Sequence, residues 1–241
     1  MRLLTRYVFP SIALYVLMSG AAFAQGLSIK SAELSLSIGE TNFSSKSFTI
    51  GPPQSATPIK GSMDLSSGKM YEAHINFYNS KRLGSEVLYG YQYGGVTFNV
   101  NRNGVPASFG IPLQVHTLTV NLLYYPFTQL NSPWRPFVFF GGGAVIYRPS
   151  SGGQRAAKDP LQGNFDTFFE TSRGTGIVGV GVKRPVTKSI GFRADAGFQL
   201  TKVPTFGLPE SSAQVSATVL PVGGTVRSFR ASAGVILNLG R

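Results

Sequence analysis

The stretch SFRASAGVILNLGR, residues 228–241, alternates between apolar and non-apolar side chains over most of its length. Its apolar residues occupy every second position: Phe229, Ala231, Ala233, Val235, Leu237 and Leu239. Polar or small residues fill most of the positions between them, among them Arg230. A period of two predicts a β-strand with one apolar face and one mixed face. Because chain ends usually fray, we expect a strand this regular to be held by a partner strand.

The first 24 residues have the features of a secretory signal peptide. Arg2 and Arg6 provide a basic start, residues 7–18 are apolar, and Ala22-Phe23-Ala24 fits a small-x-small cleavage site. The alternative is an uncleaved anchor, but the apolar stretch is well short of the ~20 residues that a spanning helix needs. The sequence therefore predicts a signal peptide over residues 1–24 and an exported product over residues 25–241.

The composition favours a β-protein that has little charge to place on a surface. The chain has 29 Gly, 18 Phe and 10 Tyr, and charged residues make up 13% of it, about half of the ~25% of a typical soluble domain. With no cysteine, disulfides, thiolate catalysis and cysteine-ligated zinc are excluded. A net charge of +12 is also common in nucleic-acid-binding proteins, but export argues against a nucleic-acid partner.

Eight alternating segments follow one another along the chain, joined in turn by long and short links. The long links cover residues 39–69, 95–111, 148–172 and 201–225. Short turns on one side and long loops on the other are typical of outer-membrane barrels, and segments of about 9 to 12 residues can span a bilayer when tilted. A sheet in lipid must also close on itself to pair all its backbone groups. The pattern predicts an all-β, eight-stranded antiparallel up-and-down transmembrane β-barrel, with the last strand paired to the first around residues 32–38.

The two faces of each segment predict what fills the barrel. In a membrane barrel the apolar face points to lipid and the mixed face points into the lumen. Glycines on the mixed face, such as Gly179 and Gly181, suit a narrow interior. Buried charges are retained only when they are paired. We therefore hypothesise a lumenal charge network made of Glu72, His74, Glu86, Lys183, Arg193, Asp195 and Arg230.

Aromatic residues gather near the segment ends, where membrane interfaces are expected. One set flanks the second short turn and comprises Tyr124, Tyr125, Phe127, Trp134 and Phe137. Another set lies toward the long links and comprises Tyr89, Tyr91, Tyr93 and Tyr147. The facing of residues 135–147 stays open, because both parities are apolar.

Two stretches carry a resemblance to a known family. NLLYYPF at residues 121–127 and RPFVFFGGGAVIY at residues 135–147 resemble the central hairpin of the OmpA/OmpX-like superfamily of small outer-membrane barrels. The resemblance implies the outer membrane of a Gram-negative-type bacterium, a monomer, and assembly by the barrel assembly machinery. It also implies a C-terminal assembly signal, whose positions are matched by Ser232, Gly234, Leu237 and Leu239. The chain departs from that signal by lacking a terminal aromatic and by continuing to Arg241.

Other motifs carry little chemistry. Gly174, Gly176 and Gly179 match a dinucleotide-binding spacing, but a strand pattern surrounds them where a helix N-terminus is required. His116 lies near the long-link end of the fourth segment, on its lipid-facing parity; a lipid A deacylase would have a serine where Leu118 stands. We expect no cofactor, no metal and no catalytic residue.

Basic residues in the long links indicate a partner. They are Lys46, Lys60, Arg102, Arg148, Arg155, Lys158 and Lys202, and such residues can bind lipopolysaccharide phosphates in the outer membrane lipid. The sequence predicts a non-enzymatic barrel that contributes to envelope integrity or surface interaction through four long extracellular loops. The alternatives are a lipid A-modifying enzyme that uses His116, and a small pore.

Overall fold

The computed structural model describes residues 31–50, 59–78, 80–102, 105–127, 133–159, 165, 168–208 and 220–239. The signal peptide predicted for residues 1–24 lies outside these ranges. The strands and the helix within them are β1 (Ser31–Phe43), β2 (Lys46–Ile50), β3 (Ile59–Leu65), β4 (Gly68–Tyr78), β5 (Leu83–Arg102), β6 (Val105–Tyr124), β7 (Arg135–Pro149), α2 (Ser151–Lys158), β8 (Thr171–Pro185), β9 (Ile190–Lys202) and β10 (Thr225–Asn238).

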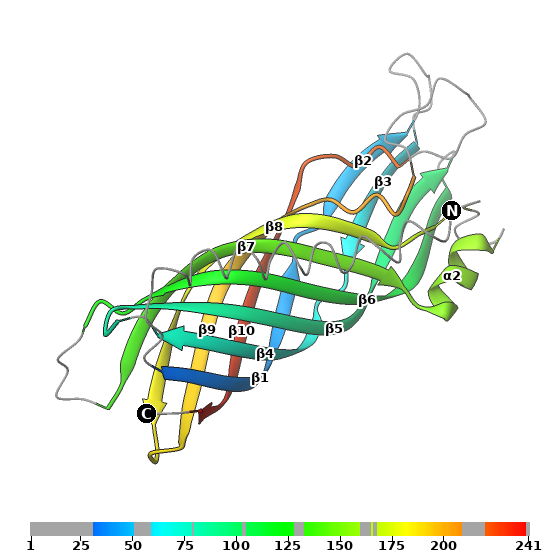
Figure 1. Cartoon of the computed structure of the whole chain (residues 1–241). Coiled ribbons are helices and arrows are strands. Elements are labelled where there is room, and N and C mark those ends of the chain that lie inside the picture. The colour runs from blue at the N-terminus through cyan, green and yellow to red at the C-terminus, as the bar shows by residue number, and fades with distance from the viewer. Residues whose placement is uncertain are drawn as a thin grey trace, which may run out of the picture.

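Eight of these strands form a closed antiparallel barrel (Figure 1). Neighbours follow the order β5-β4-β1-β10-β9-β8-β7-β6, and β5 pairs with β6 to complete the circle. β1 meets β10 from Glu33 opposite Asn238 to Phe43 opposite Ser228. The predicted fold and the pairing of the last strand with the first are therefore confirmed.

The outer surface of the barrel is apolar, as the alternation predicts. On β1, Leu36 and Ile38 are 59% and 53% exposed, whereas the intervening Ser35 and Ser37 are buried in the lumen. This arrangement, with apolar side chains outside and polar ones inside, is the reverse of that in a soluble protein. It recurs around the barrel, where the exposed apolar residues include Phe140, Val178, Val180, Phe192, Phe198 and Val235. A belt of large apolar side chains this extensive requires a lipid environment.

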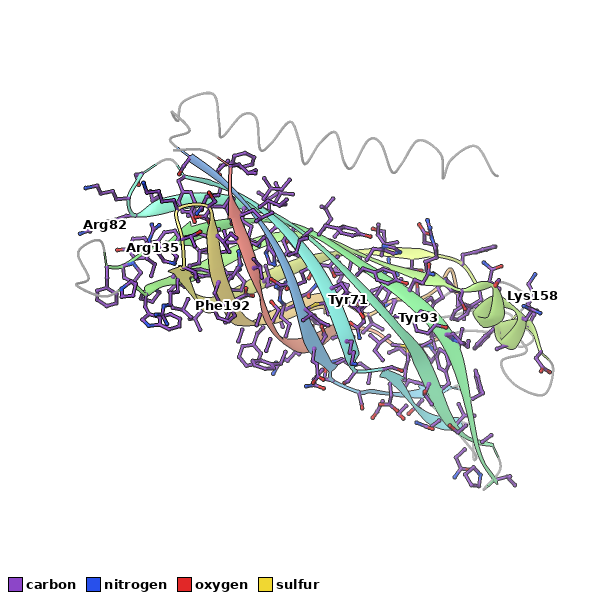
Figure 2. The ribbon with its side chains drawn as sticks, turned by 90° about the horizontal axis from the view of Figure 1, so that it is seen from below. Tyr71, Arg82, Tyr93, Arg135, Lys158 and Phe192 are labelled. Carbon is purple, nitrogen blue, oxygen red and sulfur yellow. The ribbon has the colours of Figure 1, made fainter. Side chains whose placement is uncertain are left out.

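The two ends of the barrel differ. The short links from β4 to β5, from β6 to β7 and from β8 to β9 lie at the end of the barrel where β10 finishes, at the lower left of Figure 1. The other end carries the β2–β3 hairpin and α2. In Figure 2, Arg82 and Arg135 lie at the short-turn end and Lys158 at the opposite end, with Tyr71 and Tyr93 between them.

Two predicted long links are largely strand. Residues 95–111 continue β5 and β6, and residues 39–69 contain β2 and β3, which pair with each other and with the upper part of β5. A four-stranded extension, made of β2, β3 and the upper parts of β5 and β6, therefore rises above the barrel. The prediction of an open link at 95–111 was wrong because the apolar parity changes on β5, from Tyr91 and Tyr93 facing outward to Val96 and Phe98 facing inward.

A short helix lies beside the extension. Ser150 caps α2 by accepting a hydrogen bond from the Gly153 backbone at 3.0 Å. Gly153 and Ala157 are its buried residues. A Cβ at Gly153 would lie 2.3 Å from the Pro112 carbonyl oxygen of β6, so glycine permits this close approach. Among the described residues, no helix is long and apolar enough to cross a membrane.

The facing of β7 is decided by its contacts with β8. Phe137 and Phe139 point inward, and a Cβ at Gly181 or Gly179 would lie 2.4–2.5 Å from their rings. The predicted interfacial positions of Phe137, Tyr125 and Tyr147 were therefore wrong, since all three are buried in the interior. Others of the predicted aromatic sets are exposed on the outer surface: Tyr89, Tyr93, Tyr124, Phe127 and Trp134.

Candidate functional site

The middle of the lumen is occupied by six charged or titratable side chains from four strands. Because alternate residues of a strand share a face, β4 brings Glu72 and His74 inward, and β9 brings Arg193 and Asp195 inward. Glu86 of β5 and Arg230 of β10 complete the set. All six side chains are buried.

These six side chains form a closed cycle of ion pairs in which acids and bases alternate; we call it the charge ring. Arg193 pairs with Glu86 and, through Nε, with Asp195 Oδ2 at 2.7 Å. Arg230 Nη2 lies 3.2 Å from Asp195 Oδ1 and 2.6 Å from Glu72 Oε1. His74 closes the cycle, with Nε2 3.5 Å from Glu72 and Nδ1 3.3 Å from Glu86.

The charge of the ring depends on His74. Three carboxylates face two guanidinium groups, so a neutral imidazole leaves one excess negative charge in a buried site. Each imidazole nitrogen faces a carboxylate, and only the protonated ring carries an N–H on both nitrogens. The arrangement therefore favours the imidazolium, with which the ring is electroneutral.

Lys183 lies apart from the other predicted network residues, in a second cluster. Its Nζ donates to Glu33 Oε2 at 2.8 Å and to the Tyr78 hydroxyl at 2.7 Å. Tyr78 in turn donates to Glu33 at 2.6 Å and lies 3.1 Å from the Tyr125 hydroxyl. The Arg135 guanidinium covers the Tyr125 ring, 4.8 Å from its centroid. This lower cluster lies near the short turns. Because Lys183 pairs with Glu33 and not with a carboxylate of the charge ring, the hypothesis of a single network that includes Lys183 was wrong.

Sequence reasoning missed Glu33 and Tyr78. Glu33 shares its parity with Ser35, and Tyr78 follows Glu72 and His74 on the lumenal parity. Both therefore lie on the mixed face, but near strand ends, whereas the predicted network consists of residues in mid-strand.

The upper lumen is apolar. One cluster of buried side chains joins the extension, the upper barrel and the segment after β9; its members are Phe48, Met63, Leu65, Val96, Phe98, Val100, Ile111, Leu113, Val115, Val145, Tyr147, Ala157, Phe165, Phe168, Val203, Phe206, Leu208, Leu220, Val222 and Val226. A small cavity lined by Met70, Gln92 and Gln199, among others, measures about 10 Å³. That volume holds at most one water molecule.

Phe206 is the centre of this upper cluster. It is 0% exposed and stacks on Phe168 with ring centroids 4.3 Å apart. Its φ of 53° is uncommon for a bulky residue, and the residue lies in a turn of the segment that follows β9. Arg173 holds the turn by donating to the Val203 carbonyl at 3.1 Å and to Thr205 Oγ1 at 2.6 Å.

His116 lies on the outer surface beside aromatic side chains. Its Nδ1 is 2.9 Å from the Tyr89 hydroxyl, and its ring centroid is 5.3 Å from that of Tyr91. Within the described part of the chain, no serine is hydrogen-bonded to this imidazole. Gly174, Gly176 and Gly179 lie within β8 and not at a helix N-terminus, and the described residues contain no group of His, Asp and Glu suited to a metal.

The predicted assembly-signal residues divide between the faces of β10 and its end. Ser232 and Gly234 face the lumen, and a Cβ at Gly234 would lie 2.1 Å from the Leu36 carbonyl oxygen. Leu237 and Leu239 are exposed on the apolar side. Their role in assembly stays a prediction. Arg241 lies outside the described residues.

Comparison with known proteins supports the fold and not a closer relationship. No family model matches the chain and no curated protein matches its sequence. Its structure is similar to that of the outer membrane protein OprG from Pseudomonas aeruginosa, with a TM-score of 0.53, 12% identity, and coverage of 88% of this chain and 96% of OprG. For AlkL, solved in lipid bilayers, the TM-score is 0.47 at 10% identity, with coverage of 89% of this chain and 93% of AlkL. For Neisserial surface protein A the TM-score is 0.43 at 16% identity, with coverage of 86% of this chain and 96% of that protein.

The closed eight-stranded barrel and its similarity to OprG confirm the prediction of a small outer-membrane barrel fold. Together with the apolar outer surface, the fold supports the predicted location in the outer membrane of a Gram-negative bacterium. Identities this low transfer the fold alone.

Proposed function

We propose that this chain is a sealed, non-enzymatic outer-membrane barrel that contributes to envelope integrity and displays its four-stranded extension at the cell surface. It would act as a monomer, contact lipopolysaccharide through the long-loop end, and be inserted by the barrel assembly machinery.

The filled lumen is the observation that carries this proposal. From the short turns upward, the interior contains the lower cluster around Lys183, the charge ring, and the apolar cluster around Phe206. A conducting pore needs a continuous aqueous path, as in larger barrels. Three packed layers of different chemistry favour a structural barrel over a pore.

The surroundings of His116 favour a non-enzymatic role. Hydrolysis of an acyl ester by a triad needs a nucleophile within hydrogen-bond reach of the base. The His116 imidazole contacts the Tyr89 phenol. The carboxylate whose charge acts on His116, Glu170, is paired with Arg148 Nε at 2.5 Å.

The extension supports a role in surface interaction. Its outer face carries a hydrogen-bonded row in which Asn99 donates to Asp64 at 2.8 Å and accepts from Ser108 at 2.7 Å. Beside this row lies an open groove of about 610 Å³ whose lining mixes polar residues, such as Ser62 and Asn101, with apolar ones, such as Phe48 and Pro106. A polar sheet above the membrane belt is accessible to partners outside the cell.

Planar-bilayer recordings of the purified barrel test the seal. We expect no stable conductance steps from the native protein, and steady steps at low voltage would contradict the proposal. Mass spectrometry of lipid A from cells that express the native chain or His116→Ala tests the enzyme alternative; we expect the same lipid A masses with both.

Envelope integrity can be separated from surface display with one engineered variant. In it, residues 46–65 and 97–109 are replaced by short Gly/Ser links, which removes the extension and leaves the barrel strands. We expect a strain that lacks the protein to regain detergent resistance with either version. Binding of cells to surfaces should be supported by the native chain alone, and equal binding by both versions would contradict a role of the extension.

A further inference from the structure

Two cationic side chains lie side by side on the outer surface, at the long-loop end of β9 and β10. In the antiparallel register, Lys202 is opposite Thr225 and Leu200 is opposite Arg227. Lys202 and Arg227 are therefore diagonal neighbours on the same face, a geometry in which Cα atoms are about 7–8 Å apart. Both side chains are exposed.

Neither cation has an anionic partner among the described residues. The Arg227 backbone bonds to Ser44, but its guanidinium pairs with no carboxylate of the described residues. Other arginines of the upper barrel are engaged: Arg148 pairs with Glu170, and Arg173 donates to Thr205. Like charges this close on one sheet face repel each other, and an anion bound between them would offset that repulsion.

The height of this pair in the membrane follows from the residues below it. On the same outer face, Phe198 is opposite Phe229, with ring centroids 5.2 Å apart, and both side chains are exposed. At the level of Phe229, β10 is apolar outside and polar inside. Two residues higher the order is reversed, with Arg227 outside and Val226 buried inside. This reversal marks the boundary between acyl chains and head groups in the outer leaflet.

We propose that Lys202 and Arg227 form a binding site for the phosphate of a phosphorylated glycolipid of the outer leaflet, whose acyl chains lie along Phe198, Leu200 and Phe229. Guanidinium and ammonium groups form strong charge-assisted hydrogen bonds with phosphate oxygens. Phe198, Leu200 and Phe229, below the two cations, are exposed on the outer surface of the barrel and can contact the acyl chains of the same lipid. This inference rests on the outer-membrane location in the proposed function, and it adds a defined lipid site to it.

Native mass spectrometry of the barrel, released from detergent after incubation with purified lipid A, tests the site. We expect the native chain to retain one lipid A, and Lys202→Gln/Arg227→Gln to bind at least about tenfold more weakly, because two charge-assisted contacts are lost. The matched control is Arg155→Gln/Lys158→Gln on α2, which removes the same charge from exposed positions at the same end. It should bind as the native chain does.

Three outcomes would overturn the site. Equal weakening by both double variants would indicate general attraction to a basic surface. Undiminished binding of dephosphorylated lipid A by the native chain would indicate that acyl chains alone are recognised. Competition by inorganic phosphate that fully displaces the lipid would indicate a free-phosphate site.

Failure of this inference is distinguishable from failure of the proposed function. Heat-modifiable gel migration reports whether each variant is a folded barrel, and bilayer recordings report the seal. A folded, non-conducting double variant that binds lipid A as the native chain does refutes the lipid site alone.

Discussion

Replacing Arg193 with leucine tests whether the charge ring holds the barrel together. The Arg193 side chain is fully buried, pairs with Glu86 and Asp195, and lies 5.1 Å from the Phe137 ring centroid. Arg193→Leu still packs a side chain against Phe137, now an apolar one, and removes both ion pairs. The remaining ring then carries one excess negative charge.

The expected loss in unfolding free energy depends on the partners that Asp195 and Glu86 retain in this variant. Asp195 keeps Arg230, and Glu86 keeps His74 and a hydrogen bond from Asn121 at 2.9 Å. Breaking a buried pair by removing one partner costs about 3–5 kcal/mol. Since neither carboxylate is left without a partner, we expect the loss in unfolding free energy to fall in that range and not at twice its value.

Urea titration of the barrel in lipid vesicles measures this loss. Unfolding is monitored by heat-modifiable gel migration and by the fluorescence of Trp134, the single tryptophan. Arg155→Leu on the exposed face of α2 is the control, with an expected change within about 0.5 kcal/mol. Arg193→Leu/Glu86→Gln restores neutrality and should recover part of the loss. An Arg193→Leu barrel as stable as the control variant would refute the role of the ring.

Three further substitutions test the layers of the lumen with the same titration. His74→Asn removes the imidazolium and, like Arg193→Leu, leaves one excess negative charge in the ring, so it should cost about 3–5 kcal/mol; no change would mean that the imidazole is neutral in the native ring. Gly181→Val places a side chain where a Cβ alone would lie 2.4 Å from the Phe137 ring, so a loss of about 1–3 kcal/mol is expected from overpacking, and native stability would contradict this packing. Phe206→Ala should cost about 3–5 kcal/mol without producing conductance, because the charge ring still fills the lumen; steady current through this variant would show that the apolar cluster alone forms the seal.

The barrel was predictable from sequence wherever one parity is apolar and the other is polar. On β9, the alternation of Phe192, Ala194 and Ala196 with Arg193 and Asp195 fixed both the strand and its facing before any partner was known. The same logic placed six of the seven predicted charges in one cluster, because inward-facing residues at similar heights have few other groups to pair with in a narrow lumen.

Sequence reasoning failed where the outcome depends on contacts between distant residues. The facing of β7 is set by which parity has glycines opposite it, and Phe139 fits only against Gly179. Lys183 pairs with Glu33, 150 residues away, and a choice among several carboxylates depends on their heights in the barrel. Neither relation leaves a local pattern in the chain.

The reversal of polarity along β5 and β6 explains both the missed strand and the layered lumen. Within the membrane, β5 places Tyr89 outside and Glu86 inside; above it, the same strand places Asn99 outside and Phe98 inside. The strand geometry is unchanged, and what changes is the solvent, from hydrocarbon to water. A barrel that continues past the membrane must therefore switch from a polar to an apolar interior at the boundary. The charge ring lies below that switch, enclosed by lipid around it and by the apolar cluster above it, which is why its charges must balance within the ring itself.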